Sequence, residues 1–135
     1  MNKLELSKFL LRIVLGISFF IHGLVKFQNG ISNTVERFDG YGISWVLAYI
    51  VAGVELFGGI ALILGIGTQI VSVLFVFVMM GAIQKVKLAD GFLGSAGITG
   101  YELNLAYLVI ALFLALNGSK LWTIDQVLFN KKVPE

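Results

Sequence analysis

Four apolar segments alternate with polar connections along the chain. The first runs from about residue 9 to 27, and the forty residues from Trp45 to Gln84 carry a single charge, that of Glu55. One helix of that length would reach about 60 Å, roughly twice the hydrocarbon thickness of a bilayer, so the stretch must fold back on itself. Gly65-Ile66-Gly67-Thr68 is the natural break. We therefore predict membrane-spanning helices at about 9–27, 45–65, 68–84 and 102–118.

Composition supports a membrane location. The 135 residues are 58% hydrophobic and only 13% charged, whereas soluble domains carry about 25% charged residues. A soluble fold of this composition would expose large apolar patches and aggregate. We predict a single all-α domain over 1–135, an integral membrane four-helix bundle with both termini on the same side. The first span lacks a small-residue cleavage site at its end, so we expect it to be retained.

The distribution of basic residues predicts orientation and partners. Six Lys and Arg residues flank the spans on the side of the termini and four on the other, which favours cytoplasmic termini in a multi-pass protein of the cell membrane. There is no basic stripe with a stacking platform, so we expect no nucleic-acid partner. The lipid bilayer is the expected partner, and the small-residue faces of the helices are compatible with a homodimer.

The connections also carry structural signals. Asn33-x-x-Glu36 and Thr123-x-x-Gln126 resemble capping boxes, the second opening an interfacial C-terminal helix at about 121–130. Glycine recurs at every third position from Gly91 to Gly100, which predicts a flexible, re-entrant or lid-like loop. This loop lacks the Lys-Ser/Thr of a phosphate-binding loop, so nucleotide binding is not expected there.

The residue inventory restricts the chemistry of the chain. It contains no cysteine and one histidine. Thiol–disulfide exchange, iron–sulfur clusters and thiolate-held haem are therefore excluded, and a multi-histidine metal site cannot form within one protomer. We expect no metal, and any redox chemistry would depend on a cofactor or a partner.

Glu55 is the first candidate for chemistry. It lies about ten residues into its span, and an ionised side chain at a span centre costs about 2.5–3.5 kcal/mol on insertion scales. We expect it to face the bundle interior, either paired with a cation or protonated, in a catalytic or a structural role. Arg12 is either a snorkelling anchor or the partner of Glu55, because their Cα levels differ by roughly 9 Å on ideal helices.

His22 and Lys26 share one helix face, since they are spaced i, i+4. His22 is a candidate catalytic group beside Glu55, or an ordinary interfacial histidine. Gln84, Lys85, Glu102 and Asn104 should gather at the same outer level, because the third span ends there and the fourth begins there. The candidate substrate-binding residues are Arg12, Lys26, Gln84 and Glu102, although Glu102 and Lys85 alternatively form a surface ion pair.

Taken together, these residues resemble the DoxX family of small bacterial membrane proteins. The resemblance is carried by the run from Arg12 to Phe27, by Glu55-Leu-Phe-Gly58-Gly59 through Gly65, and by Lys85-Val-Lys87 and Tyr101-Glu102-Leu103. It implies a four-span bundle in the cell membrane, an oxidoreductase assignment, a link to quinone or catechol detoxification, and redox partners. The family's signature positions correspond here to Arg12, Gly16, His22, Gly23, Lys26, Glu55, Gly58, Gly59 and Gly65. Relatives in the wider superfamily have reactive cysteines that this chain lacks.

Two functional hypotheses follow. In the first, the chain is an oxidoreductase subunit that handles quinones or related phenols: an apolar cavity admits the ring, and Arg12, His22, Lys26 and Glu55 bind its oxygens or move protons. A quinone is then the expected cofactor or substrate, and a soluble redox enzyme or bound cofactor supplies the electrons. In the second, the chain is a non-enzymatic membrane scaffold, lipid-binding module or small-molecule permease, and its buried charges are architectural.

Overall fold

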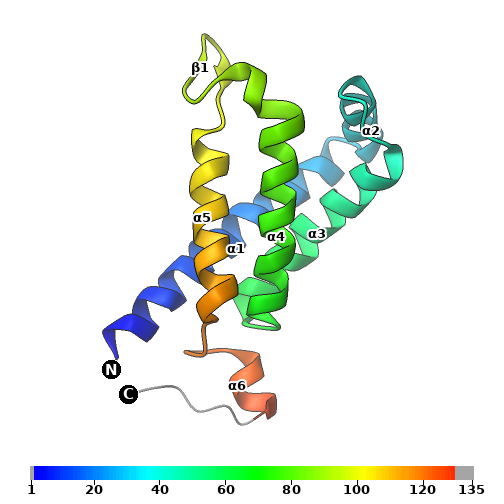
Figure 1. Ribbon diagram of the computed structural model, residues 1–135. Helices are drawn as coiled ribbons and strands as arrows, with labels where there is room; N and C mark the ends of the chain where they lie inside the picture. Colours follow the sequence, from blue (N-terminus) through cyan, green and yellow to red (C-terminus); the bar gives the residue numbers. More distant parts are fainter. Residues whose placement is uncertain (1, 130–135) are drawn as a thin grey trace.

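Helices make up most of the fold (Figure 1). The computed structural model describes residues 2–129 of the chain. In chain order the elements are α1 (Lys3–Gln28), α2 (Ile31–Gly40), α3 (Trp45–Leu64), α4 (Thr68–Ala82), the π-helical turn η1 (Ile83–Lys87), the 3-10 turn η2 (Leu88–Asp90), β1 (Gly94–Ser95), β2 (Ile98–Thr99), α5 (Glu102–Asn117) and α6 (Ile124–Phe129).

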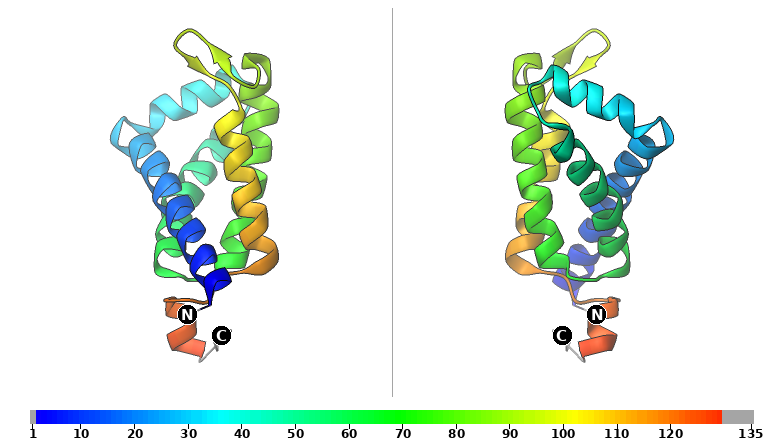
Figure 2. Two further views of the ribbon diagram at one scale, coloured as in Figure 1. Left: turned by 90° about the vertical axis from the view of Figure 1, so that its left-hand side faces the viewer. Right: turned by 90° about the vertical axis from the view of Figure 1, so that its right-hand side faces the viewer.

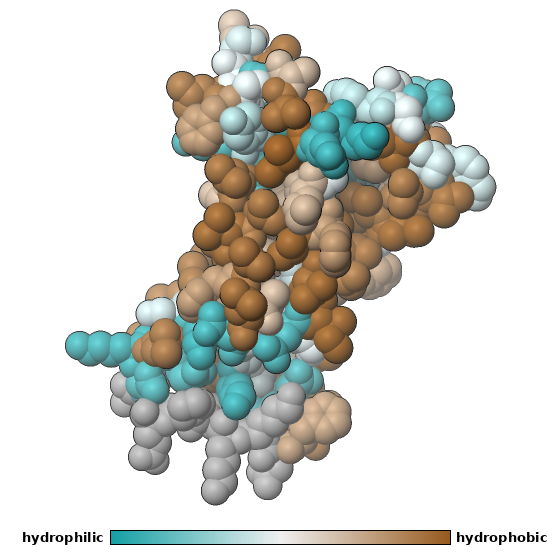
Figure 3. Space-filling view, viewed as in Figure 1, coloured by the Kyte–Doolittle hydropathy of each residue, from teal (hydrophilic) through white to brown (hydrophobic). Residues whose placement is uncertain are grey.

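The prediction of an all-α membrane bundle is confirmed. α1, α3 and the continuous helical segment Thr68–Asp90 are long and apolar enough to cross a membrane. α5 has 16 residues, about 24 Å at 1.5 Å per residue, which is shorter than the ~30 Å of a typical hydrocarbon core. On the face shown in Figure 3, apolar residues cover the middle of the bundle, and hydrophilic residues gather at the end near α6. The start of α1 lies at this same end (Figure 1).

α3 and α4 are joined by the tight turn that the sequence predicts. Gly65 ends α3 with φ +75°, and Gly67 precedes α4 with φ +56°; glycine adopts this left-handed conformation without the steric cost of a side chain. Gly65 is also crowded, because a Cβ there would lie 2.5 Å from the Cβ of Thr123. Glycine at this position therefore both reverses the chain and admits the C-terminal segment.

The four long helices form two pairs. α1 packs mainly against α3 and α4 mainly against α5, and the pairs diverge toward the end that carries α2 and the hairpin (Figure 2). The rings of Phe19 on α1 and Phe75 on α4 stack between the pairs, with centroids 3.9 Å apart and planes 11° from parallel. The fully buried residues around this stack include Leu15, Leu62, Ala111 and Leu114.

A hydrogen-bonded β-hairpin replaces the flexible loop that we predict for residues 91–100. β1 and β2 pair antiparallel, with Gly94 opposite Thr99. Lys87 Nζ donates to the carbonyl oxygen of Thr99 at 3.2 Å and to its hydroxyl oxygen at 3.0 Å. The hairpin is thereby tied to the π-helical end of α4.

The N-cap half of one of the two predicted capping boxes is confirmed. The N–H of Gln126 donates to Thr123 Oγ1 at 2.9 Å, and α6 begins directly after Thr123, although it has only six residues. The box predicted at Asn33 is wrong, because α2 begins earlier, at Ile31, and Asn33 lies inside it. Residue 130 and the predicted interfacial Lys131 and Lys132 lie outside the described residues.

Candidate functional site

The close contact between α1 and α3 positions the charged residues of the site. A Cβ on Gly23 would lie 2.4 Å from the backbone nitrogen of Leu56, and one on Gly59 would lie 2.5 Å from that of Phe20. Small residues permit such backbone approach between membrane helices. With Gly23 held against Leu56, Lys26 lies one helical turn further along α1 and faces Glu55.

Lys26 and Glu55 form a buried ion pair. Lys26 Nζ lies 2.5 Å from Glu55 Oε2, and the two side chains keep 19% and 5% of their exposed area. Because Glu55 is in the middle of α3, its carboxylate cannot reach water along the helix. The cationic partner from α1 offsets part of the cost of holding this charge in hydrocarbon. Glu55 thus faces the bundle interior and pairs with a cation, as expected.

His22 brings a third helix to the site. It lies one turn before Lys26 on α1, is exposed on the flank of the bundle, and meets Tyr107 of α5 edge to face, with ring centroids 6.2 Å apart. Tyr107 also contacts Phe19 at 5.6 Å between centroids. Tyr107 lies half-buried between the helices. Its phenol is a candidate site group that the sequence does not single out.

Arg12 does not pair with Glu55, so the predicted possibility of an ion pair between these two residues is wrong. Its guanidinium is fully buried at the opposite end of α1. Nη1 donates to Ser119 Oγ and to the carbonyl oxygen of Leu121, both at 3.0 Å, and Nη2 donates to that of Trp122 at 3.1 Å. Arg12 therefore holds the segment after α5 against the bundle.

Gln84 and Glu102 lie apart from this ion pair. Both are exposed, Gln84 in η1 and Glu102 at the first position of α5. Within residues 2–129, neither forms a hydrogen bond or ion pair with His22, Lys26 or Glu55, and Glu102 does not pair with Lys85. Their assignment to substrate binding stays a prediction without a contact to support it.

The site offers proton donors and an acceptor on three helices. Lys26 and His22 come from α1, Glu55 from α3 and Tyr107 from α5. An ammonium carries three N–H bonds, and Lys26 donates one of them to Glu55. Within residues 2–129 no group of three His, Cys, Asp or Glu side chains could hold a metal ion. The arrangement can hydrogen-bond a carbonyl or phenolic oxygen and exchange protons with it.

The fold and the buried ion pair define a small helical membrane protein with a polar site between its helices. The chain belongs to the DoxX family, whose family model matches residues 7–88. It is 41% identical over 133 residues to a protein of Bacillus subtilis (strain 168) named "Putative oxidoreductase CatD", covering 98% of this chain and 95% of that one.

A second relative comes from Mycobacterium tuberculosis. The chain is 30% identical over 126 residues to the "Uncharacterized membrane protein Rv3486" of Mycobacterium tuberculosis (strain ATCC 25618 / H37Rv), covering 86% of this chain and 77% of that one. No solved structure gives a significant match.

Proposed function

We propose that this protein is the membrane subunit of a quinone- or phenol-handling oxidoreductase, with its ligand site at Lys26, Glu55, His22 and Tyr107. The observation that carries the proposal is the ion pair of Lys26 and Glu55, 2.5 Å between Nζ and Oε2, within membrane-spanning helices. Ionisable groups in such positions are costly and typically mark ligand sites or proton pathways. The oxidoreductase name of the relative from Bacillus subtilis supports the reaction class.

Quinone reduction suits these side chains. A quinone takes up two electrons and two protons to become a hydroquinone. Lys26 would donate a hydrogen bond to one ring oxygen while Glu55 holds the ammonium in place. Lys26 would pass one proton to this oxygen, and His22 or Tyr107 would give the second proton to the opposite oxygen. The electrons would come from a soluble redox enzyme that docks on the membrane subunit, since the chain has no cysteine for thiol chemistry.

Access from the bilayer fits a lipophilic ligand. His22 is exposed, and the two helix pairs diverge toward the end that carries α2 (Figure 2). Lys26 keeps 19% of its side-chain exposure despite its ion pair. A ring that entered sideways from the lipid would therefore meet His22 first and then Lys26.

Anaerobic titration of the purified protein with menaquinone or a substituted benzoquinone tests the proposal. Saturable binding is expected for the natural sequence. Lys26→Met should weaken this binding about tenfold or more, because it deletes a charged hydrogen bond worth about 1.5–3 kcal/mol. Lys85→Met is the matched control: it removes the same side chain from the exposed turn η1 and should leave the affinity unchanged.

Two outcomes would reject the proposal: no saturable binding by the natural sequence, or equal affinity in the Lys26→Met and Lys85→Met variants. The second outcome would favour an architectural ion pair in a non-enzymatic scaffold. Isolation of the protein from membranes would then test for a stoichiometric soluble partner, whose retention by the Lys26→Met variant would agree with scaffolding.

A further inference from the structure

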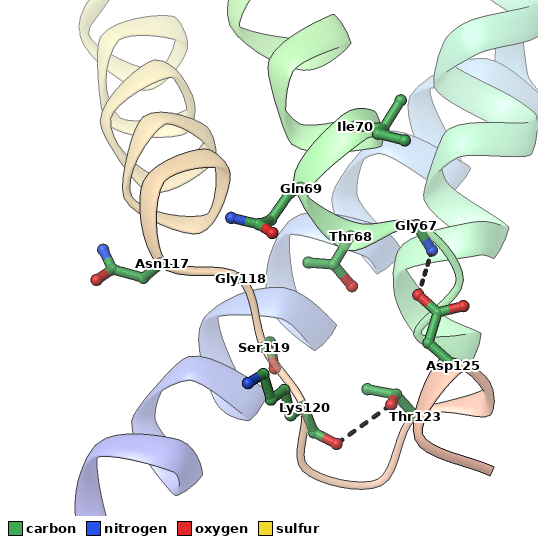
Figure 4. A pocket seen from close by; sticks show the side chains of 10 residues that line it. All are labelled: Gly67, Thr68, Gln69, Ile70, Asn117, Gly118, Ser119, Lys120, Thr123 and Asp125. Atoms are coloured by element: carbon green, nitrogen blue, oxygen red, sulfur yellow. Dashed lines mark hydrogen bonds between the residues drawn. The ribbon is translucent and has the colours of Figure 1, made fainter. Parts of the chain in front are cut away.

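The end of the bundle near α6 contains a pocket that is separate from the ion-pair site. Its volume is about 150 Å³, and it lies between the start of α4 and the segment that follows α5 (Figure 4). The polar part of its lining includes Thr68, Gln69, Ser119, Lys120 and Asp125. None of these residues belongs to the proposed quinone site.

Backbone N–H groups at the start of α4 face this region. The first hydrogen bond within the helix runs from the N–H of Val71 to the carbonyl oxygen of Gly67 at 3.0 Å, so the N–H groups of residues 68–70 have no acceptor inside α4. A helix N-terminus of this kind favours an anion through these donors and through the helix dipole. The helix has 15 residues, long enough for a full dipole.

The hydroxyl of Thr68 is an independent sign of an occupant. Its residue is only 5% exposed, and its Oγ1 has no hydrogen-bond partner among the described residues. In Figure 4 this oxygen points from the first turn of α4 toward the segment that carries Ser119. A buried hydroxyl without a partner is unfavourable. A ligand oxygen in the pocket would supply the missing partner.

Two further donors lie on the opposite wall. Ser119 is 8% exposed, and its Oγ accepts from Arg12 Nη1 at 3.0 Å. Its own O–H therefore remains available as a donor, and the buried arginine fixes its position. Lys120 is exposed at the rim and adds a positive charge. Serine and threonine hydroxyls, a lysine and helix N–H groups together form the donor set that binds phosphate oxygens.

One acidic residue belongs to the same lining. Asp125 Oδ2 accepts from the N–H of Gly67 at 2.7 Å, so this carboxylate is engaged at the turn that precedes α4. It repels an anion at that end of the pocket. The favourable position is accordingly the other end, between Thr68, Ser119 and Lys120.

We infer that this pocket binds a phosphate group. The pocket is lined by the start of α4, the segment after α5 and α6, and hydrophilic residues gather at the α6 end of the bundle (Figure 3), as they do at the level of phospholipid headgroups. The occupant is therefore a phospholipid phosphate, and a free phosphate ion shares the same chemistry. Binding there would tie the start of α4 to the segment held by Arg12.

Thermal unfolding of the delipidated protein in a maltoside detergent, which contains no phosphate, tests the site. Short-chain phosphatidylglycerol should raise the unfolding temperature in a saturable way, because a ligand that binds only the folded state stabilises it. Thr68→Val removes the hydroxyl and keeps the shape, and Lys120→Gln removes the charge. Each should weaken binding about tenfold or more. Asp125→Asn should tighten it severalfold, because it removes the repelling charge and keeps an acceptor for Gly67.

Ser72→Ala is the matched control. The Ser72 hydroxyl is also buried and without a partner, but it lies one turn further along α4 and does not line the pocket. This variant should bind as the natural sequence does. Inorganic phosphate added alone separates the two sources: an equal shift at equal concentration would identify a free phosphate compound, and no shift would identify the lipid. The inference is overturned if neither probe binds, or if the Thr68→Val and Ser72→Ala variants bind equally well.

Discussion

Replacing Gly23 with alanine tests whether backbone contact between α1 and α3 holds the site together. The added Cβ would lie 2.4 Å from the backbone nitrogen of Leu56, about 1 Å closer than the 3.4 Å at which ordinary contact begins. The obstacle is backbone, so no side chain can rotate away from it. The two helices must separate, and Lys26 must then move away from Glu55.

The expected loss follows from this geometry. A gap of 0.5–1 Å forfeits about a quarter to a half of the dispersion attraction between facing atoms, and overpacking typically costs about 1–3 kcal/mol. The higher helix propensity of alanine offsets about 0.5–1 kcal/mol of this loss of stability. We therefore expect Gly23→Ala to lower the free energy of unfolding by about 1–2 kcal/mol.

Reversible unfolding with dodecyl sulfate in mixed micelles, followed by circular dichroism, measures this difference. Gly53→Ala is the control, because Gly53 lies in α3 with nothing within 4 Å of an added Cβ. It should be neutral or slightly stabilising. Equal stability of the Gly23→Ala and Gly53→Ala proteins would refute the backbone contact.

Three further predictions use the same unfolding assay. Lys26→Met and Glu55→Gln should each destabilise the protein by up to about 3–5 kcal/mol, because each removes one partner of a buried pair. The double variant should lose less stability than the sum of the two single losses, and strict additivity would argue against coupling. Arg12→Lys keeps the charge, but its side chain cannot reach all three acceptors, so the free energy of unfolding should fall by about 1.5–3 kcal/mol. Protease cleavage after residue 119 should also become faster, and an unchanged cleavage rate would contradict the role of Arg12. Phe19→Leu should cost about 0.5–1.5 kcal/mol beyond the lost area through its stack with Phe75, and a smaller effect would mean that the stack contributes little.

Elements with a local cause could be predicted from the sequence. The apolar run that is too long for one crossing fixes the turn between α3 and α4, and two glycines allow that turn to be tight. The start of α6 could be predicted from Thr123, because its hydroxyl caps this helix. Glu55 had to find a partner because an isolated carboxylate in hydrocarbon is costly.

The identity of that partner could not be predicted, because it depends on how two helices are set against each other. An axial offset of roughly 9 Å made Arg12 reachable from Glu55 on ideal helices. The contact of Gly23 with Leu56 instead brings Lys26 to the carboxylate. Arg12 donates to backbone carbonyl oxygens in the segment after α5. This segment has no periodic hydrophobic pattern, so the sequence does not predict these acceptors.

The candidate substrate-binding residues Gln84 and Glu102 lie apart from the ion pair for a related reason. The sequence places the end of one span and the start of the next at a common level, but it does not show how far the helix pairs diverge. The π-helical turn at the end of α4 and the hairpin after it add length at this end. Both residues lie exposed on the α4–α5 pair.

The hydrogen bonds of Arg12 have a consequence for biosynthesis. Ser119, the first of its acceptors along the chain, is made 107 residues after it, about 5–20 s later at typical ribosomal rates. During this interval α1 is already available for insertion with a guanidinium whose final acceptors do not yet exist. The early helix must keep that charge near the headgroups, and its depth becomes fixed only when translation delivers the last segment.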